Sequence, residues 1–126
     1  MKADRFTGEY PADWPEIAKA VKEAAGWCCV RCGHPHDAPA GYVLTVHHLD
    51  GDKANCRWWN IPALCQRCHL TIQAKVNMAQ VWALEHSDWF KPYAAGYYAF
   101  RYLGEGLTRA EVDARMPDLL ALERIA

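Results

Sequence analysis

The stretch Thr45–Ile72, TVHHLDGDKANCRWWNIPALCQRCHLTI, holds three histidines and three cysteines in 28 residues. It includes two adjacent histidines, His47 and His48, and near its end it has a Cys-x-x-Cys-His sequence at residues 65–69. A second Cys-x-x-Cys pair lies upstream, at Cys29 and Cys32. Two such pairs supply the four thiolates of a closed structural zinc site, which leaves the histidines for a second site.

The spacing of the two pairs predicts one zinc ion with four cysteine ligands: Cys29, Cys32, Cys65 and Cys68. Either His34 or His36 is an alternative to one of these thiolates, and a redox dithiol is the alternative to a metal site. The Cys-x-x-Cys-His sequence also matches a c-type haem attachment site, but haem would leave the upstream pair and the adjacent histidines unexplained. Cys28 and Cys56 lie outside the pairs, and we expect both to be free, buried thiols.

In order and spacing, these residues resemble the motif of the HNH nuclease family. The matching positions are the upstream cysteine pair and, within the quoted stretch, His47, His48, Asn60 and Leu64-Cys65-x-x-Cys68-His69. The resemblance covers residues 27–77. It implies a ββα-metal fold around a divalent cation and cleavage of phosphodiester bonds in nucleic acid. A phage or mobile-element origin would fit the family.

The resemblance also implies a role for each matching side chain. His47 is a ligand of the catalytic cation. His48 is the general base that takes a proton from water, and the histidine pKa of about 6.5 suits that task near neutral pH. Asn60 pins the long loop that precedes it and so orients His48. His69, presented by a helix, is the second ligand of the cation.

Position 73 departs from the family pattern. Some relatives have a further ligand there, one helical turn after His69, whereas this chain has the neutral Gln73. We therefore expect two protein ligands, with water and phosphate completing the coordination shell. Magnesium tolerates a water-rich shell, whereas imidazole ligands favour manganese, nickel or zinc. The identity of the catalytic divalent cation therefore stays open among these four metals.

The distribution of charge bears on DNA binding. The chain has a net charge of −1, and only residues 27–78 are net basic, with five basic and three acidic side chains. Nucleases that rely on phosphate contacts usually have more lysine and arginine, so we expect weak DNA affinity or help from a partner protein. Four side chains are candidates for phosphate contact: Lys53, Arg57, Arg67 and Lys75. Trp58 and Trp59 could stack on bases, but adjacent tryptophans are more often core residues.

The sequence also bears on where the protein works. No run of about 18 apolar residues is present, so no membrane span is expected. The first 14 residues lack the apolar segment of a signal peptide. Without export, the paired cysteines favour metal binding in a reducing compartment over disulfides. We therefore expect cytoplasmic localisation, in a bacterium or a phage-infected host cell.

Hydrophobic periodicity and turn residues predict the elements of secondary structure. A first helix over 14–25 should start after Asp13, the expected N-cap, with Pro15 in its first turn. Strands are expected over 42–47 and 61–64, followed by a helix from residue 65 or 66. The remaining expected helices lie over 78–85, over 92–103, after Thr108, whose Thr-Arg-Ala-Glu sequence matches a capping box, and after Pro117.

Together these features predict a single α+β domain over residues 1–126. A zinc-stapled ββα-metal unit over 27–77 is flanked by an N-terminal helix and by a helical extension over 78–126. The expected function is metal-dependent hydrolysis of DNA, in which a monomer nicks one strand and a homodimer is needed for a double-strand break. The alternatives are a zinc-ribbon-like module that binds nucleic acid or protein without catalysis, and an adaptor that borrows the fold. A pure zinc module has no need for the four residues His47, His48, Asn60 and His69, and an adaptor would use the acidic C-terminal third as its interaction surface.

Overall fold

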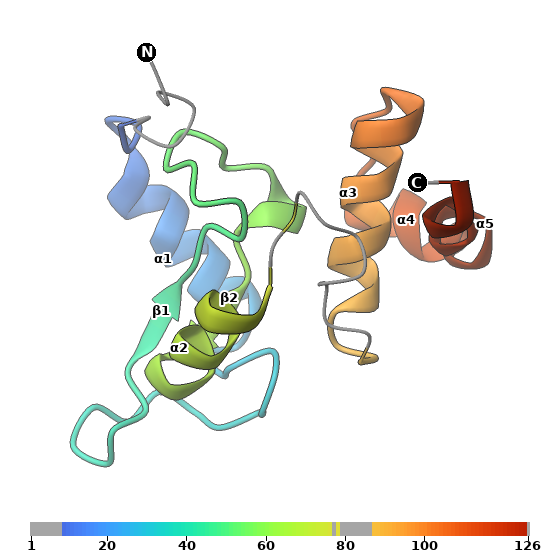
Figure 1. The fold of residues 1–126 in the computed structure, drawn as a ribbon. Helices are drawn as coiled ribbons and strands as arrows, with labels where there is room; N and C mark the ends of the chain where they lie inside the picture. The colour runs from blue at the N-terminus through green and yellow to red at the C-terminus, as the bar shows by residue number, and fades with distance from the viewer. Residues whose placement is uncertain (1–8, 77, 79–86, 126) are drawn as a thin grey trace.

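The computed structural model describes residues 9–76, 78 and 87–125 of a small α+β protein. Its elements, in chain order, are α1 (Trp14–Ala24), β1 (Leu44–Val46), η2 (Trp58–Asn60), β2 (Ala63–Cys65), α2 (Gln66–Lys75), α3 (Lys91–Leu103), α4 (Arg109–Ala114), α5 (Met116–Leu120) and η4 (Ala121–Ile125). In Figure 1, α1 and the strands lie with α2 on one side of the molecule, and α3, α4 and α5 lie on the other. The helix predicted over 78–85 falls outside the described residues except for Met78.

β1 and β2 form a two-stranded antiparallel sheet in which Thr45 lies opposite Leu64. The helix α2 begins at the residue after β2, so the order along the chain is strand, strand, helix. Both strands have three residues and differ in bounds from the predicted strands. Tyr42 pairs with Asp37 instead, in a separate bridge that closes a loop. Pro62, which has no N–H to donate, precedes β2 and accepts a hydrogen bond from the His47 amide at 3.2 Å.

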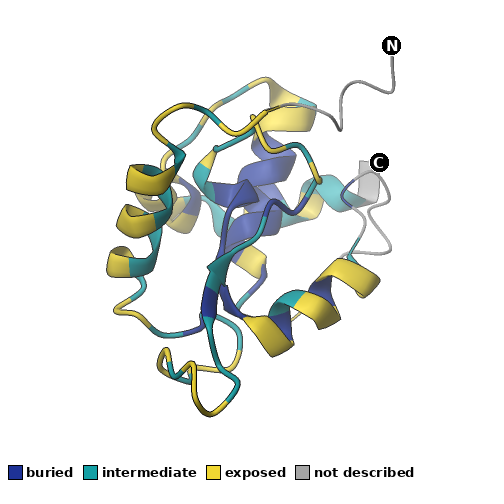
Figure 2. Cartoon of the chain, turned by 90° about the vertical axis from the view of Figure 1, so that its left-hand side faces the viewer, coloured by how far each residue is buried: buried dark blue, intermediate teal, exposed yellow. Residues whose placement is uncertain are grey.

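The helix α1 confirms the predicted first helix and packs against β1. None of its residues is buried, and Figure 2 shows it in the colours of exposed and intermediate residues. Pro15 lies in the first turn as expected, but the Asp13 side chain makes no capping hydrogen bond, so that part of the prediction is wrong. Gly26 and Trp27 end the helix with φ values of 64° and 57°, the left-handed backbone that stops an α-helix.

The helix α3 is buried from Pro92 to Ala99, and Figure 2 shows it as dark blue ribbon inside the molecule. Gly96 lets it approach η2 closely, because a Cβ at that position would lie 2.9 Å from atoms of both Trp58 and Trp59. Trp59 is buried, and Trp58 is half-buried with its Nε1–H donating to the Leu107 carbonyl at 2.8 Å. Both tryptophans are therefore core residues, as favoured from the sequence.

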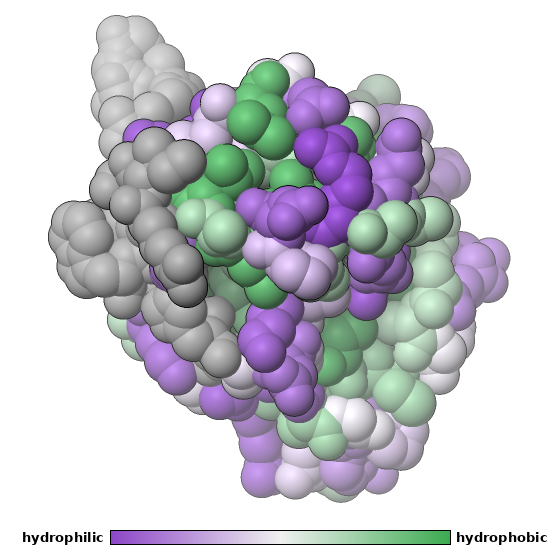
Figure 3. Space-filling model, turned by 90° about the vertical axis from the view of Figure 1, so that its right-hand side faces the viewer, coloured by the Kyte–Doolittle hydropathy of each residue, from purple (hydrophilic) through white to green (hydrophobic). Residues whose placement is uncertain are grey.

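The short C-terminal helices cover one side of α3. Thr108 and Glu111 form the predicted capping box at the start of α4, and Pro117 lies in the first turn of α5. Val112 and Leu119 pack into a second apolar cluster with alanines of α3. Figure 3, which views the side where α4 and α5 lie in Figure 1, shows hydrophobic and hydrophilic residues interleaved on this face. Within the described part of the chain, no helix has the length and apolar character needed to cross a membrane.

Candidate metal centre and active site

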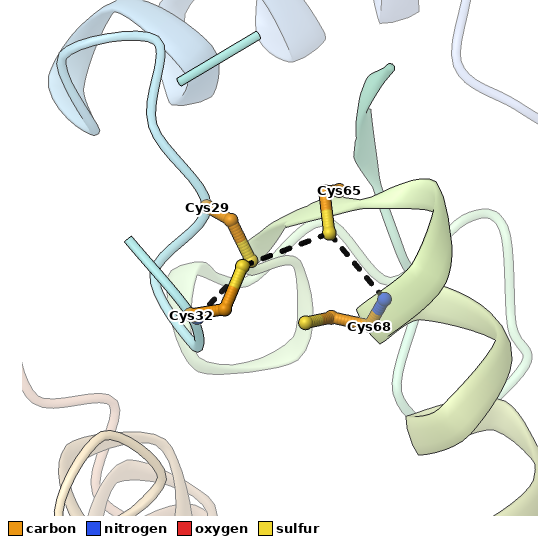
Figure 4. Close-up of side chains that lie close together, drawn as sticks. All are labelled: Cys29, Cys32, Cys65 and Cys68. Atoms are coloured by element: carbon orange, nitrogen blue, oxygen red, sulfur yellow. Dashed lines mark hydrogen bonds between the residues drawn. The ribbon is translucent and has the colours of Figure 1, made fainter. Parts of the chain in front are cut away.

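Four cysteine sulfurs converge where the loop after α1 meets the start of α2 (Figure 4). The Sγ atoms of Cys29, Cys32, Cys65 and Cys68 all lie within 4.8 Å of one another. The Sγ atoms of Cys32 and Cys65 are 3.8 Å apart. Two sulfurs bound to one tetrahedral zinc at about 2.3 Å are expected to lie about 3.8 Å apart. The structure thus brings the predicted ligand set together, and the cluster is consistent with a structural zinc site.

The local backbone shapes each cysteine pair for metal binding. The Cys32 N–H points at Cys29 Sγ at 3.5 Å, and the Cys68 N–H points at Cys65 Sγ at 3.4 Å. The thiol of Cys65 thereby caps the N-terminus of α2. The Arg31 guanidinium donates to Cys68 Sγ at 3.4 Å. Such donors favour the thiolate form that a metal requires.

The pKa values of three of these thiols bear on metal binding. Burial raises the pKa of Cys29, but hydrogen bonds from backbone amides outweigh burial and lower it to about 7. Burial raises the pKa of Cys68 to about 12 and also raises that of Cys32. Thiolates this close repel one another, and a bound divalent cation would offset that repulsion and displace the protons.

Neither histidine alternative belongs to the sulfur cluster. His36 Nδ1 accepts a hydrogen bond from the Leu44 amide at 2.9 Å, and His34 stacks on Tyr42 with ring centroids 3.5 Å apart. The prediction that Cys28 and Cys56 are buried is wrong, because both are half-buried. They lie outside the helices and strands, where the chain runs over the surface.

Two of the predicted catalytic-site histidines, His47 just after β1 and His69 on α2, face each other. The rings of His47 and His69 have centroids 4.3 Å apart. Thr45 on β1 controls the tautomer of His69, because its one hydroxyl hydrogen goes to the Leu64 carbonyl at 2.8 Å. The same oxygen lies 3.1 Å from His69 Nδ1 and must therefore accept from an Nδ1–H. The lone pair of His69 Nε2 is then left for a cation.

His47 and His48 both follow the end of β1 and line one open hollow of about 860 Å³. Adjacent residues in a regular strand would point to opposite faces, so the end of the strand at Val46 allows this arrangement. Burial, followed by the charges of His69 and His48, lowers the pKa of His47 to about 4. Burial also lowers the pKa of His69. Both rings are thus neutral at pH 7, the form that binds metal.

His48 is 7% exposed and lies in an aromatic environment. Its ring is 4.8 Å from the Trp14 ring of α1 and 5.8 Å from the Tyr10 ring. Burial lowers the pKa of His48, although the charges of Asp50 and Asp52 act in the opposite direction. A neutral imidazole held against Trp14 is able to accept a proton.

Asn60 is fully buried and ties the loop that follows His48 to η2. Its Oδ1 accepts from the Asp50 amide at 3.0 Å. Its Nδ2 donates to Asp50 Oδ1 at 2.8 Å and to the Asn55 carbonyl at 2.9 Å. These contacts match the loop-pinning role that the resemblance implies for Asn60.

Three of the four basic residues predicted to contact phosphate lie against aromatic rings. The distances from cation to ring centroid are 5.1 Å for Lys53 over Tyr10, 4.2 Å for Arg57 over Phe100 and 4.4 Å for Arg67 over Tyr42. Arg67 also donates to the Tyr42 hydroxyl at 3.3 Å, on the ring that His34 stacks on. Of the four, only Lys75 lines the hollow with His47 and His48.

The structure places further residues beside the candidate site that sequence reasoning missed. Arg101 on α3 lines the same hollow, where its guanidinium donates to the Tyr97 hydroxyl at 3.1 Å. Trp14 covers His48, and Thr45 orients His69. No local pattern indicates these roles, because each depends on a contact between segments far apart in the chain.

The comparisons with known proteins give a distant, partial match. No protein-family model matches the chain, and no solved structure matches it. Over 66 residues the chain is 33% identical to the Zorya protein ZorE of Escherichia coli. The match covers 52% of this chain and 18% of ZorE, so this chain spans less than a fifth of that relative. The match does not support the phage origin suggested by the family resemblance.

Proposed function

We propose that this chain is an HNH-type endonuclease that uses a divalent cation to hydrolyse phosphodiester bonds in DNA. The observation that supports the proposal most is the facing pair His47 and His69, with Nε2 of His69 left for a cation by Thr45. The buried, neutral His48 and the loop held by Asn60 lie beside this pair. The partial similarity to ZorE adds support from sequence.

The donor set fits a catalytic cation, since two neutral imidazoles leave room for water and phosphate in the shell. Bound there, the cation would supply charge stabilisation for the phosphorane and the leaving 3′-oxygen. His48 accepts a proton from the attacking water through Nε2, and the resulting imidazolium is stabilised by Asp50 and Asp52. Arg101 and Lys75, which line the same hollow, bind and orient the phosphates on either side of the cut.

The structure also suggests how the chain meets DNA. With one candidate site among the residues that the structure describes, a monomer nicks one strand, and a double-strand break needs a second copy or a partner protein. The aromatic contacts of Lys53, Arg57 and Arg67 leave their charges at the surface but limit their reach. We infer that intrinsic DNA affinity is weak, and that Arg101 supplies part of the positive charge at the site.

A supercoiled-plasmid assay with magnesium, manganese, nickel and zinc in parallel tests the proposal. The wild-type chain should convert supercoiled plasmid to the open circle with at least one cation, and His48→Ala should not. His34→Ala is the matched control, because His34 stacks on Tyr42 away from the hollow. Equal cleavage by wild type and His48→Ala would point to a contaminating nuclease. No cleavage with any cation, in protein that still binds DNA or a partner, would favour the zinc-ribbon-like binding module.

A further inference from the structure

Cys56 is a thiol that neither the zinc cluster nor the proposed reaction uses. Its Sγ lies 3.7 Å from Nε2 of His48, the atom proposed to accept the proton from water. His48 is 7% exposed, whereas Cys56 is half-buried and so reachable from solvent. A soft sulfur donor and an imidazole nitrogen thus point at each other beside the candidate active site.

The separation of these two atoms suits a shared metal ion. Zinc binds histidine nitrogen at about 2.0–2.1 Å and cysteine sulfur at about 2.3 Å, so tetrahedral geometry puts the two donors about 3.6 Å apart. The observed 3.7 Å needs almost no rearrangement. The carboxylates of Asp13 and Asp52 act electrostatically on Cys56. Those of Asp50 and Asp52 act on His48 and oppose the smaller effect of the Lys53 charge, so negative charge predominates around the pair.

We propose that His48 Nε2 and Cys56 Sγ form a second binding site for a thiophilic divalent cation such as zinc, and that an ion bound there inhibits cleavage. The thiol releases its proton to solvent, sulfur and nitrogen each donate one lone pair to the ion, and no electron is transferred. Water is available to complete the shell. The inhibitory part rests on the proposed function, because the bound ion occupies the lone pair that the general base needs.

The alternative use of this pair, a cysteine nucleophile activated by histidine, is disfavoured by its environment. Burial raises the pKa of Cys56, and the charges of Asp13 and Asp52 raise it further. A nucleophilic cysteine requires the opposite, a depressed pKa in a positively charged environment. A divalent cation overcomes this penalty because its own charge stabilises the thiolate.

Cobalt absorption tests the site without relying on cleavage. Protein with one equivalent of zinc in the four-cysteine cluster is titrated with Co²⁺, which binds more weakly than zinc and so leaves the cluster occupied. Only a cobalt ion bound to sulfur gives sulfur-to-metal charge-transfer absorption, so cobalt at His47 and His69 does not contribute to the band. Wild type should show the band and Cys56→Ser should lack it. Cys28→Ser, which removes the other half-buried free thiol, should keep it.

Two results would overturn the site: no sulfur-to-cobalt band in wild type while zinc remains at one equivalent, or an equal band in Cys56→Ser. Thermal unfolding of both variants shows whether they fold, and Cys56→Ala serves as a second variant if the serine protein does not.

The inhibitory part is tested by adding zinc to cleavage reactions run with magnesium or manganese. For each variant, the zinc concentration that halves its own cleavage rate is measured. This concentration should be at least about tenfold higher for Cys56→Ser than for Cys28→Ser. Equal inhibition would refute the inhibitory role. Absence of cleavage under all conditions would refute the proposed nuclease while leaving the cobalt result to decide the site.

Discussion

Replacing Thr45 with valine tests whether its hydroxyl prepares His69 to bind the catalytic cation. The hydroxyl hydrogen goes to the Leu64 carbonyl at 2.8 Å, and the oxygen lies 3.1 Å from His69 Nδ1. Valine has nearly the same shape as threonine but neither donates nor accepts a hydrogen bond. The His69 ring would then be free to choose either tautomer and to rotate away from His47.

The structure indicates two separable effects of this substitution. Loss of a hydrogen-bond partner behind a metal-bound histidine weakens metal binding about 10- to 100-fold, or about 1.4–2.7 kcal/mol. Loss of the hydroxyl bond to the Leu64 carbonyl lowers the free energy of unfolding by about 0.5–1.5 kcal/mol, and Thr45 is only half-buried. The protein should therefore stay folded while the affinity of the catalytic cation falls.

Calorimetric titration with manganese, on protein whose four-cysteine cluster holds zinc, measures that affinity directly. Thr71→Val is the matched control, because the exposed Thr71 hydroxyl donates to the Arg67 carbonyl within α2. His69→Ala sets the loss expected when a ligand is removed. If Thr45→Val binds manganese within about twofold of Thr71→Val while His69→Ala binds much more weakly, the tautomer argument is refuted. If His69→Ala also binds normally, His69 is not a ligand.

Four other expectations follow from the same contacts. Cys68→Ser should unfold the centre of the protein, because structural zinc supplies about 10–16 kcal/mol, whereas Cys28→Ser should not; a folded Cys68→Ser protein, seen by thermal unfolding with zinc analysis, would contradict this. His48→Ala should lose cleavage but keep manganese affinity, and His47→Ala should lose affinity; the reverse pattern would exchange the two roles. Burial lowers the pKa of His48 from 6.5, so the rate should be flat above that pH and fall only at lower pH as the base becomes protonated; an inflection above 6.5 in a pH–rate profile speaks against it. DNA affinity of His48→Ala protein should fall with salt by about 0.9 log units per log unit for each phosphate contact, and Arg101→Ala should reduce that slope by about 0.9; an unchanged slope would remove Arg101 from the interface.

The sequence by itself was sufficient where neighbouring residues determine structure. The two Cys-x-x-Cys pairs predict the four ligands because the amide of the second cysteine bonds the sulfur of the first within one turn. For the same reason, the sequence predicted α1, the end of α3 before Gly104 and the capping box at Thr108. The strand bounds were not, because pairing depends on a partner strand about 20 residues away.

Only the tertiary structure decided how the candidate active site is assembled. Thr45 and His69 meet because β1 pairs with β2 immediately before α2 starts. Trp14 covers His48 from a helix more than 20 residues earlier, and Arg101 reaches the hollow from α3. The approach of Cys56 to His48 follows from a loop folded by the buried Asn60. Burial and distance set the pKa values and the free lone pairs of these groups, and both arise only when distant segments pack together.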